Sequence, residues 1–356
     1  MEIEAEGLRK IYPSKAGPVE ALDGVDLRVA RGKIFGFLGP NGAGKTTVIR
    51  ILVTLSRPTS GTARVAGFDV VGQPRQVRSH IGYVSQAGGV DGGMTGRANL
   101  LLQARLQGMS KADAMARVGE LAGRFSLEEV LDRPAATLSG GLSRRLALAM
   151  GLVHRPSVVF LDEPTLGLDP SARVELWQEI GALSAEGATV FLTTHYLEEA
   201  DTLCDELAII DHGRIVSQDS PAALKRQVAD GEVVSVTVGH GHGGSDEVRE
   251  EAEALPGVRR VWWEGDVLRV AVTDGSEAMP QLLRRLDAGP VSVRSVALSA
   301  PSLDDVFLHK TGRTLRGVDS AGNGSRGGHA GNAGDTRKEE GLEDSGNPDA
   351  DQLQGA

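Results

Sequence analysis

A glycine-rich loop between an apolar run of strand length and a helical segment constrains the fold more than any other feature of this sequence. The run Ile34–Leu38 is made of apolar residues and one glycine. The loop that follows satisfies the pattern G-x-x-x-x-G-K-S/T and consists of Gly39, Pro40, Asn41, Gly42, Ala43, Gly44, Lys45, Thr46 and Thr47. Glycine lets the backbone curl so that successive N–H groups and a helix N-terminus face phosphate oxygens. This P-loop therefore predicts a triphosphate site in which Lys45 contacts the β- and γ-phosphates and Thr46 is a Mg²⁺ ligand.

A second apolar run, at residues 158–161, ends in two carboxylates, Asp162 and Glu163. At a phosphate site, Asp162 would hold Mg²⁺, and Glu163 would polarise a water for in-line attack on the γ-phosphate. A pair of acids after a strand is also common in turns and helix caps. The P-loop upstream favours the first interpretation, and Glu163 favours hydrolysis over nucleotide binding without turnover.

The chain is too long for one ordinary domain, because its 356 residues exceed the usual range of about 100–200. Up to about residue 230, buried-strand patterns alternate with helical ones, which predicts an α/β domain around a buried sheet at residues 1–230. Strand patterns stop between residues 87 and 137, where helical segments are expected at 99–108, 111–123 and 127–131. We therefore place a helical subdomain at about residues 87–155.

After residue 230 the pattern changes to the order β-α-β-β-α-β. Strands are expected at 233–238, 258–263, 267–272 and 291–297, and helices at 246–255 and 276–287. This is the order of the ferredoxin-like split motif, so we place a small α+β accessory domain at residues 231–312. The stretch 317–356 holds eight acids, three bases and ten glycines, and we expect residues 313–356 to form a disordered acidic tail.

Composition excludes several classes of function. The net charge of −10 argues against a general nucleic-acid-binding protein. The single cysteine, Cys204, provides neither an internal disulfide nor a metal cage. No apolar run reaches the roughly 18 residues needed to cross a bilayer, and the acidic residues 1–6 are unlike a signal peptide. We therefore expect a cytoplasmic protein that does not itself cross a membrane.

Further short motifs accompany the P-loop and the acidic strand end. Leu138, Ser139, Gly140 and Gly141 stand about twenty residues before the strand that ends at Asp162, and Gln86, Asp169, His195 and Tyr12 lie at four other places in the first domain. In that setting residues 138–141 resemble the signature loop of ABC transporter ATPases, and Gln86 resembles their Q-loop. Asp169 resembles their D-loop, His195 their switch histidine and Tyr12 the aromatic residue that stacks on adenine. The resemblance covers residues 1–228, with every motif in the family's order.

The resemblance implies an ABC-type P-loop NTPase fold with ATP and Mg²⁺ as cofactors. It implies catalytic roles for Lys45, Gln86, Glu163 and His195, metal ligation by Thr46, Gln86 and Asp162, and ATP binding by Tyr12 and the P-loop. It also implies a head-to-tail dimer, homomeric or heteromeric, in which the signature loop contacts the opposite subunit's ATP and Asp169 lies at the dimer contact. From the residues alone, simpler interpretations stay open: a strand-end aromatic at Tyr12, a turn at Gln86, a core histidine at His195 and a helix cap at Asp169.

Departures from the common family pattern indicate a branch. Leu142 stands where many relatives have glutamine, Ser143, Arg144 and Arg145 follow it, and a late segment reads Ser302-Leu303-Asp304-Asp305-Val306-Phe307-Leu308. These features resemble the drug exporters of the daunorubicin-resistance type. The resemblance implies a peripheral ATPase on the cytoplasmic face of the cell membrane that drives efflux of a hydrophobic drug or antibiotic.

The same resemblance implies separate integral-membrane permease subunits, which this family docks on the helical insert. Arg97, Leu101, Leu102 and Arg105 are candidates for that surface, although a solvated helix face explains the arginines equally well. Cargo of another class, a lipid, peptide or polysaccharide, stays open. A soluble ABC ATPase acting on ribosomes or DNA is disfavoured by the single P-loop and the acidic balance.

Overall fold

The computed structural model describes residues 1–312 except 16, 229–230, 240–245, 289–291 and 300. At its centre is a sheet with the strand order β10-β9-β3-β8-β7-β6. Every residue of β3 (Ile34–Leu38), β7 (Val158–Asp162) and β8 (Thr189–Thr194) is buried. The sheet is parallel except at its edge and is completed by β6 (Ile81–Val84), β9 (Glu206–Asp211) and the antiparallel β10 (Arg214–Asp219). Strands buried on both faces need the continuous apolar runs seen in the sequence, and the expected α/β architecture is confirmed.

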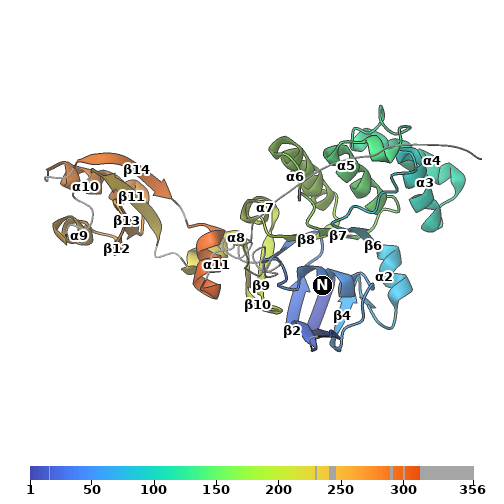
Figure 1. Cartoon of the computed structure of the whole chain (residues 1–356), viewed down its shortest axis with the longest axis horizontal. Coiled ribbons are helices and arrows are strands. Elements are labelled where there is room, and N and C mark those ends of the chain that lie inside the picture. The colour runs from blue at the N-terminus through green and yellow to red at the C-terminus, as the bar shows by residue number, and fades with distance from the viewer. Residues whose placement is uncertain (16, 229–230, 240–245, 289–291, 300, 313–356) are drawn as a thin grey trace, which may run out of the picture.

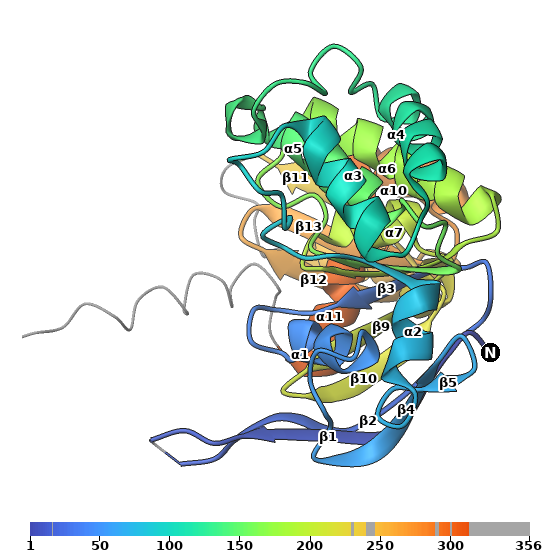
Figure 2. The ribbon, with the colours of Figure 1, turned by 90° about the vertical axis from the view of Figure 1, so that its right-hand side faces the viewer.

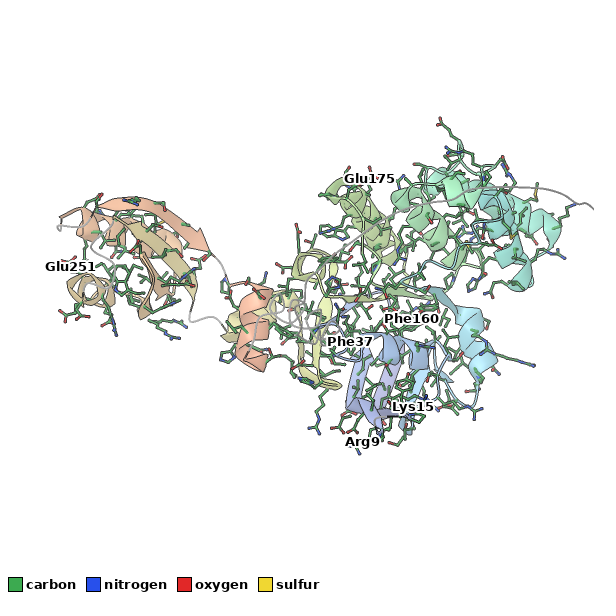
Figure 3. The ribbon with its side chains drawn as sticks, viewed as in Figure 1. Arg9, Lys15, Phe37, Phe160, Glu175 and Glu251 are labelled. Atoms are coloured by element: carbon green, nitrogen blue, oxygen red, sulfur yellow. The ribbon has the colours of Figure 1, made fainter. Side chains whose placement is uncertain are left out.

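A second, antiparallel sheet packs against one face of this central sheet. Its strand order is β2-β1-β4-β5, with β1 (Ile3–Tyr12), β2 (Val19–Val29), β4 (Ser60–Val65) and β5 (Phe68–Asp69). Together with α1 (Lys45–Leu52) and α2 (Pro74–His80) it encloses a core that contains the fully buried Phe37 and Phe160 (Figure 3). Figure 2 shows the antiparallel strands below the central sheet and the helical layer above it.

The opposite face of the central sheet carries helices. The helical insert contributes α3 (Gly96–Leu106), α4 (Lys111–Arg124), the short 3₁₀ turn η1 (Ala135–Thr137) and α5 (Gly140–Gly151), and α6 (Pro170–Ala185) lies beside them (Figure 1). Leu121 of α4, Leu146 of α5 and Ile180 of α6 are buried in one continuous core with the sheet. The helical subdomain is therefore packed onto the same sheet that carries the P-loop.

One predicted helix in this insert is wrong. Residues 127–131 form turns, although Leu127 and Leu131 are buried as an amphipathic helix would bury them. The break comes at Ser126, which adopts a left-handed φ of 52°, and the N–H of Leu127 then bonds back to the carbonyl of Ala122. The spacing of apolar residues predicted correctly which side chains are buried, but the chain turns back just after the end of α4 and does not start a new helix.

The accessory domain has the expected ferredoxin-like arrangement. Its sheet has the order β12-β13-β11-β14, with β11 (Glu232–Val238), β12 (Val258–Glu264), β13 (Val267–Val272) and β14 (Val293–Ser299). The helices α9 (Asp246–Glu253) and α10 (Gly275–Ala288) contribute Val248, Ala252, Leu282 and Leu286 to a core of its own. The tail expected at residues 313–356 lies outside the described residues.

The last described helix returns to the first domain. Helix α11 (Leu303–Thr311) packs against α8 (Pro221–Val228) and α7 (Leu197–Leu203), and Leu303, Val306 and Phe307 are buried in the core that also holds α5 and α6. Ser302 and Asp305 form a capping box at its start. Along the chain, the accessory sheet therefore lies between two helices that pack together. No helix in the described part of the chain has both the length and the apolar character of a membrane span.

Candidate nucleotide-binding site

Four parallel strands deliver the predicted site residues to one edge of the central sheet. β3 leads into the P-loop, β6 into Gln86, β7 into Asp162 and Glu163, and β8 into His195. The register pairs Leu38 with Thr194 and Asp162 with Thr193, so the carboxyl ends of these strands are level. Ligands of open α/β sheets bind at this edge. The fold thus brings together residues that are far apart in the sequence, because the P-loop after β3 lies beside the end of β8, where the N–H of Gly39 bonds to the carbonyl of Thr194.

The P-loop is wrapped tightly around the end of β3. The N–H of Gly39 bonds to the carbonyl of Thr194, and a Cβ at Gly39 would lie 2.4 Å from the carbonyl oxygen of Ile210. Gly44 precedes α1 with a φ of 110°, which L-residues with a side chain rarely adopt. Lys45 Nζ donates to the carbonyl oxygens of Gly39 (2.7 Å) and Pro40 (3.1 Å). The ammonium group therefore lies inside the loop, where phosphate oxygens would be cradled.

The oxygen atoms at the other side of the P-loop suit a hard divalent cation. Asp162 Oδ1 accepts a hydrogen bond of 2.6 Å from Thr193 Oγ1 and one of 3.4 Å from Thr46 Oγ1. Asp162 is buried, whereas Thr46 is exposed. Mg²⁺ prefers carboxylate and hydroxyl oxygens together with phosphate oxygens, so the donor set fits the predicted metal. Thr193 was not predicted as a site residue, and its only sequence signal is its place two residues before His195.

Glu163 lies at the meeting point of the other predicted catalytic residues. Its Oε1 is 3.3 Å from Lys45 Nζ and 3.4 Å from His195 Nδ1, and its Oε2 accepts from Gln86 Nε2 at 3.3 Å. Burial alone would raise the pKa of this carboxyl. The neighbouring His195 and the charge of Lys45 outweigh burial and hold its pKa below the ordinary value. Glu163 is therefore an ionised carboxylate at neutral pH.

Tyr12 stands at the end of β1 and is half-buried. The ammonium group of Lys10 lies 4.9 Å from the centroid of its ring, and the same ammonium donates to the carbonyl oxygen of Arg57 at 2.7 Å. One face of the aromatic ring is thus covered by a cation. Stacking of adenine on Tyr12 stays a prediction.

The signature loop and the D-loop line a second cleft of about 330 Å³. Ser139 caps α5 by accepting from the N–H of Leu142, and Asp169 caps α6 by accepting from the N–H of Ala172. The N-terminus of α5, capped by a neutral hydroxyl, opens into this cleft and suits an anion, whereas the N-terminus of α6 is already occupied by the Asp169 carboxylate. The cleft is lined by Ser139, Gly140, Gly141, Leu142, Arg145, Gly167, Leu168, Asp169 and Ala172. Residues of the P-loop and the pair Asp162 and Glu163 are not among them.

Comparisons with known proteins agree with this geometry. Residues 22–166 match the ABC transporter family model, and residues 220–311 match the model of the C-terminal domain of DrrA1-3-like ATP-binding proteins. The daunorubicin resistance ATP-binding protein DrrA2 of Streptomyces coeruleorubidus is 42% identical over 318 residues, which cover 89% of this chain and 97% of that protein. The doxorubicin resistance ATP-binding protein DrrA of Mycobacterium tuberculosis (strain ATCC 25618 / H37Rv) is 41% identical over 87% of this chain and 94% of its own length.

Other relatives extend the likeness to a second kind of exporter. The Nod factor export ATP-binding protein I of Paraburkholderia xenovorans is 38% identical over 88% of this chain and 98% of that protein. Among solved structures, an ATP-binding subunit of an ABC transporter superposes with a TM-score of 0.58 at 29% identity, covering 64% of this chain and 93% of that one. A dimeric bacterial ABC transporter cassette superposes with a TM-score of 0.57 at 25% identity, covering 61% and 98%. This chain therefore belongs to the daunorubicin- and doxorubicin-resistance ATP-binding proteins, the ATP-hydrolysing subunits of a drug-resistance and export branch of the ABC transporter family.

Proposed function

We propose that this chain hydrolyses MgATP with Glu163 as general base and thereby drives an exporter. The observation that carries the proposal is the convergence of Lys45, Gln86 and His195 on the Glu163 carboxylate at the edge where the P-loop lies. An ionised carboxylate can accept a proton from an attacking water, and a lowered pKa keeps it in that form. The site therefore has both a phosphate cradle and a base.

Binding of ATP changes the partners of Lys45. Its ammonium now serves Glu163 and two loop carbonyls, and an incoming β,γ-phosphate offers it charged oxygens instead. Glu163 then loses one cation and keeps Gln86 and His195 as neighbours, which orient it toward the γ-phosphate. Thr46 and Asp162 would hold Mg²⁺, with Gln86 as the third predicted ligand, and the ion would supply charge neutralisation on the phosphate oxygens. His195 donates to the γ-phosphate from the side of β8.

We infer a dimer from the distance between the signature loop and the P-loop of the same chain. The cleft formed by the signature loop and the D-loop includes the N-terminus of α5, which suits an anion, but it does not include the P-loop of its own chain. In a head-to-tail pair of two copies, or of this chain with a related one, Ser139 and Gly140 would close on the γ-phosphate held by the other subunit, and Asp169 would lie at the contact. The similar cassette solved as a dimer supports this arrangement.

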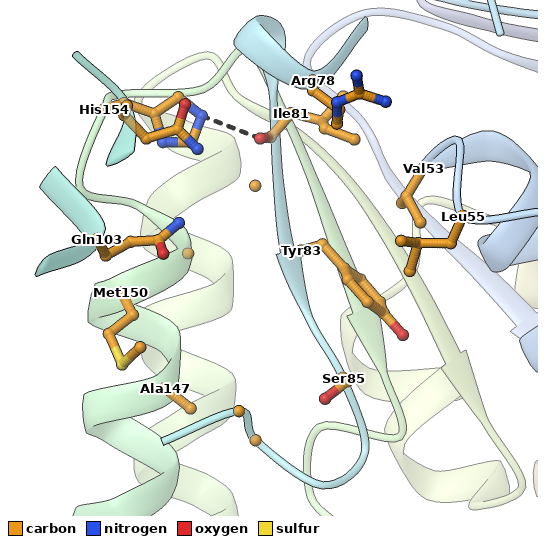
Figure 4. A pocket seen from close by; sticks show the side chains of 15 residues that line it. Val53, Leu55, Arg78, Ile81, Tyr83, Ser85, Gln103, Ala147, Met150 and His154 are labelled. Atoms are coloured by element: carbon orange, nitrogen blue, oxygen red, sulfur yellow. Dashed lines mark hydrogen bonds between the residues drawn. The ribbon is translucent and has the colours of Figure 1, made fainter. Parts of the chain in front are cut away.

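A groove beside the Q-loop is our proposed docking site for a membrane permease. It has a volume of about 320 Å³ and runs between β6 and α5, where Tyr83, Ala147 and Met150 face it (Figure 4). Val53 and Leu55 lie on the opposite side of the groove from Met150 and Gln103, and Leu55 is 59% exposed. A groove of apolar and amide side chains suits a short helix from a partner. Docking there would hold the chain on the cytoplasmic face of the membrane.

The residues predicted for this docking surface divide into two groups. Leu102 on α3 is 48% exposed and Leu101 packs against the core, so the leucines present a partly apolar helix face. Arg97 instead forms a paired contact with Asp132, and Arg105 donates to the carbonyl oxygen of Met109. Neither these arginines nor these leucines line the groove, where Gln103 of α3 and Gln107 just after it do. We therefore assign the groove wall to the two glutamines in place of the four residues predicted from the sequence.

The proposed cargo is a hydrophobic drug or antibiotic, which the names of the daunorubicin- and doxorubicin-resistance relatives support. The alternative is cargo of another class, a lipid, peptide or polysaccharide, because a relative that is 38% identical is named for Nod factor export. The test has two parts. Purified Glu163→Gln should bind ATP and lose turnover by about 10²-fold or more, while Glu129→Gln, which removes the same charge from an exposed position, should behave as the natural protein.

The second part measures cargo. Cells that lack the gene are supplied with the natural sequence or with Glu163→Gln, and accumulation of a fluorescent anthracycline is followed together with membrane fractionation. Lower accumulation with the natural sequence alone, in a membrane-bound protein, supports the proposal. Equal accumulation with a membrane-bound protein refutes the drug cargo, sedimentation with ribosomes refutes the exporter, and unchanged turnover in Glu163→Gln refutes the base.

A further inference from the structure

Arg144 of α5 is buried among the backbone of the nucleotide site, although it was not predicted to have a role. Its side chain is 9% exposed. It donates to five carbonyl oxygens: Nε to Pro164 (2.6 Å), Nη1 to Ser85 (2.8 Å) and Gln86 (3.3 Å), and Nη2 to Asp162 (3.1 Å) and Glu163 (3.0 Å). All five belong to two segments, the end of β7 and the start of the Q-loop. One guanidinium group therefore joins the segments that carry Gln86 and Glu163.

The partners of Arg144 distinguish it from an ordinary structural ion pair. A buried cation is costly and is normally paired with a carboxylate. Here the hydrogen-bond acceptors are neutral backbone carbonyls, and the charges that favour the cation, on Asp162 and Glu199, act from further away. Guanidinium offers five donors in a rigid planar fork, which an ammonium group does not. The hydrogen bonds of Arg144 therefore hold two backbone segments together, and they do not pair the guanidinium with a carboxylate.

The backbone at Glu163 needs such support. Its φ is 48°, a left-handed conformation that is rare for a residue with a long side chain and that costs about 1–3 kcal/mol unless surrounding contacts enforce it. The N–H of Glu163 bonds to Thr193 on β8, and the carbonyls on both sides of its Cα, those of Asp162 and Glu163, accept from Arg144. Arg144 thus holds the peptides that aim the carboxylate at the P-loop.

We propose that Arg144 is a positioning residue for hydrolysis: it holds Glu163 and the Q-loop backbone in register across β7 and β6. The inference rests on the proposed role of Glu163 as base. Arg144 lies on the helix that begins at the signature loop, so the position of that helix and the aim of the base are mechanically linked. Without the guanidinium, five carbonyls lose a donor, and those of Ser85 and Glu163 keep only the N–H groups of Gly88 and Leu166. The strained Glu163 peptide then relaxes, while the P-loop, which Arg144 does not contact in these bonds, stays intact.

The chain contains a matched control for this substitution. Arg117 of α4 is also 9% exposed and donates to the carbonyls of Val153 (3.2 Å) and Leu152 (2.9 Å), at the opposite end of α5 from the signature loop. Unlike Arg144, it also pairs with a carboxylate, that of the exposed Glu120. Arg144→Met and Arg117→Met each remove a buried guanidinium that bonds to backbone carbonyls. Both should lower the thermal unfolding temperature, but only Arg144 touches the backbone of the nucleotide site.

The experiment compares kcat, KM for ATP, equilibrium ATP binding and thermal unfolding in Arg144→Met, Arg144→Lys, Arg144→Gln and Arg117→Met. We expect kcat to fall about 10²-fold in Arg144→Met, the size of effect that a misplacement of about 1 Å produces, with KM changed less than about 3-fold. Arg144→Lys should recover little, because one ammonium cannot span both segments. Arg117→Met should unfold at a lower temperature and keep kcat within about 2-fold of the natural protein. A lower unfolding temperature without a loss of kcat is the result expected of a purely structural residue.

Two results would overturn the proposal. One is a kcat in Arg144→Met within about 3-fold of the natural protein, and the other is an equal loss of kcat in Arg117→Met. If Arg144→Met does not fold, the milder Arg144→Gln is judged by the same limits. Glu163→Gln is measured in parallel: if it keeps its turnover, the proposed base is wrong, whereas normal turnover in the Arg144 variants beside an inactive Glu163→Gln refutes the positioning role alone.

Discussion

The packing of α11 makes a quantitative prediction about stability. Phe307 follows the whole accessory domain in the sequence, yet it is fully buried in the core of the ATPase domain, against α7 and α8. Replacing a buried phenylalanine by alanine typically costs about 3–5 kcal/mol. For a domain of this size each kcal/mol corresponds to about 2–4 °C in Tm. Phe307→Ala should therefore lower the Tm of the ATPase domain by at least about 6 °C.

Two controls separate this effect from a general loss of stability. Leu308→Ala changes the next residue of the same helix, where the side chain is 44% exposed, and should shift Tm by less than about 2 °C because little buried surface is lost. Leu286→Ala removes a side chain from the separate core of the accessory domain and should lower only the transition of that domain.

The assay is differential scanning calorimetry of the full chain, repeated with MgATP, which should raise the ATPase transition and so identify it. Phe307→Ala should lower the transition that responds to ATP and leave the other in place. If Phe307→Ala lowers only the transition that Leu286→Ala lowers, or changes Tm no more than Leu308→Ala does, α11 does not belong to the ATPase core and the reasoning fails.

Three further predictions concern buried ionisable groups. Burial raises the pKa of the Cys204 thiol, so iodoacetamide at pH 8 should modify this single cysteine only after unfolding, as mass spectrometry would show, and rapid labelling of the native protein would contradict its burial. Burial also raises the pKa of Glu199, although Trp177 donates a hydrogen bond to its carboxylate. The folded state then loses stability as pH rises above about 4.3. Glu199→Gln should therefore gain more in Tm at pH 8 than at pH 5, whereas equal gains would show that the carboxylate carries no such penalty. The lowered pKa of Glu163 contributes stability above about pH 4.3, and this stability is lost as pH falls through the pKa of the folded state. Lys45→Met removes one cause of the lowered pKa, so the difference in Tm between the natural protein and the variant should shrink between pH 5 and pH 3.5. A constant difference would argue against the Lys45–Glu163 contact.

The local patterns of the sequence were sufficient for most of the fold. A strand that is buried on both faces needs an unbroken apolar run, and β3, β7 and β8 show it directly. The residues at the ends of those strands meet at one sheet edge because parallel strands share a direction, which explains why Lys45, Asp162 and Glu163 could be placed together before any coordinates. The ferredoxin-like order of the accessory domain was similarly legible from its alternating patterns.

What the sequence did not disclose are contacts between segments that no local rule connects. Arg144 stands between Ser143 and Arg145, and arginine is rarely buried, so nothing local indicates that it donates to five carbonyls. The segment that includes Val306 and Phe307 was noted only as a motif that resembles one branch of the family, and such a motif does not say which surface buries these residues. The error at residues 127–131 has the same origin, since a left-handed Ser126 converts a helical pattern into a turn.

Because α11 packs on the ATPase domain, its sequence position after the accessory sheet does not make it part of that sheet's domain, and this decides where labels should be attached to compare the two domains. Cys204 is buried, so thiol labels introduced elsewhere have little competition from it. A label at Lys310, exposed on α11, moves with the ATPase domain, whereas a label at Glu250, exposed on α9, moves with the accessory sheet. The distance between such a pair reads the rotation of one body against the other during turnover. Because the chain enters the accessory sheet after α8 and leaves it before α11, two helices that pack together, both ends of the accessory sheet are tied to one place on the ATPase domain.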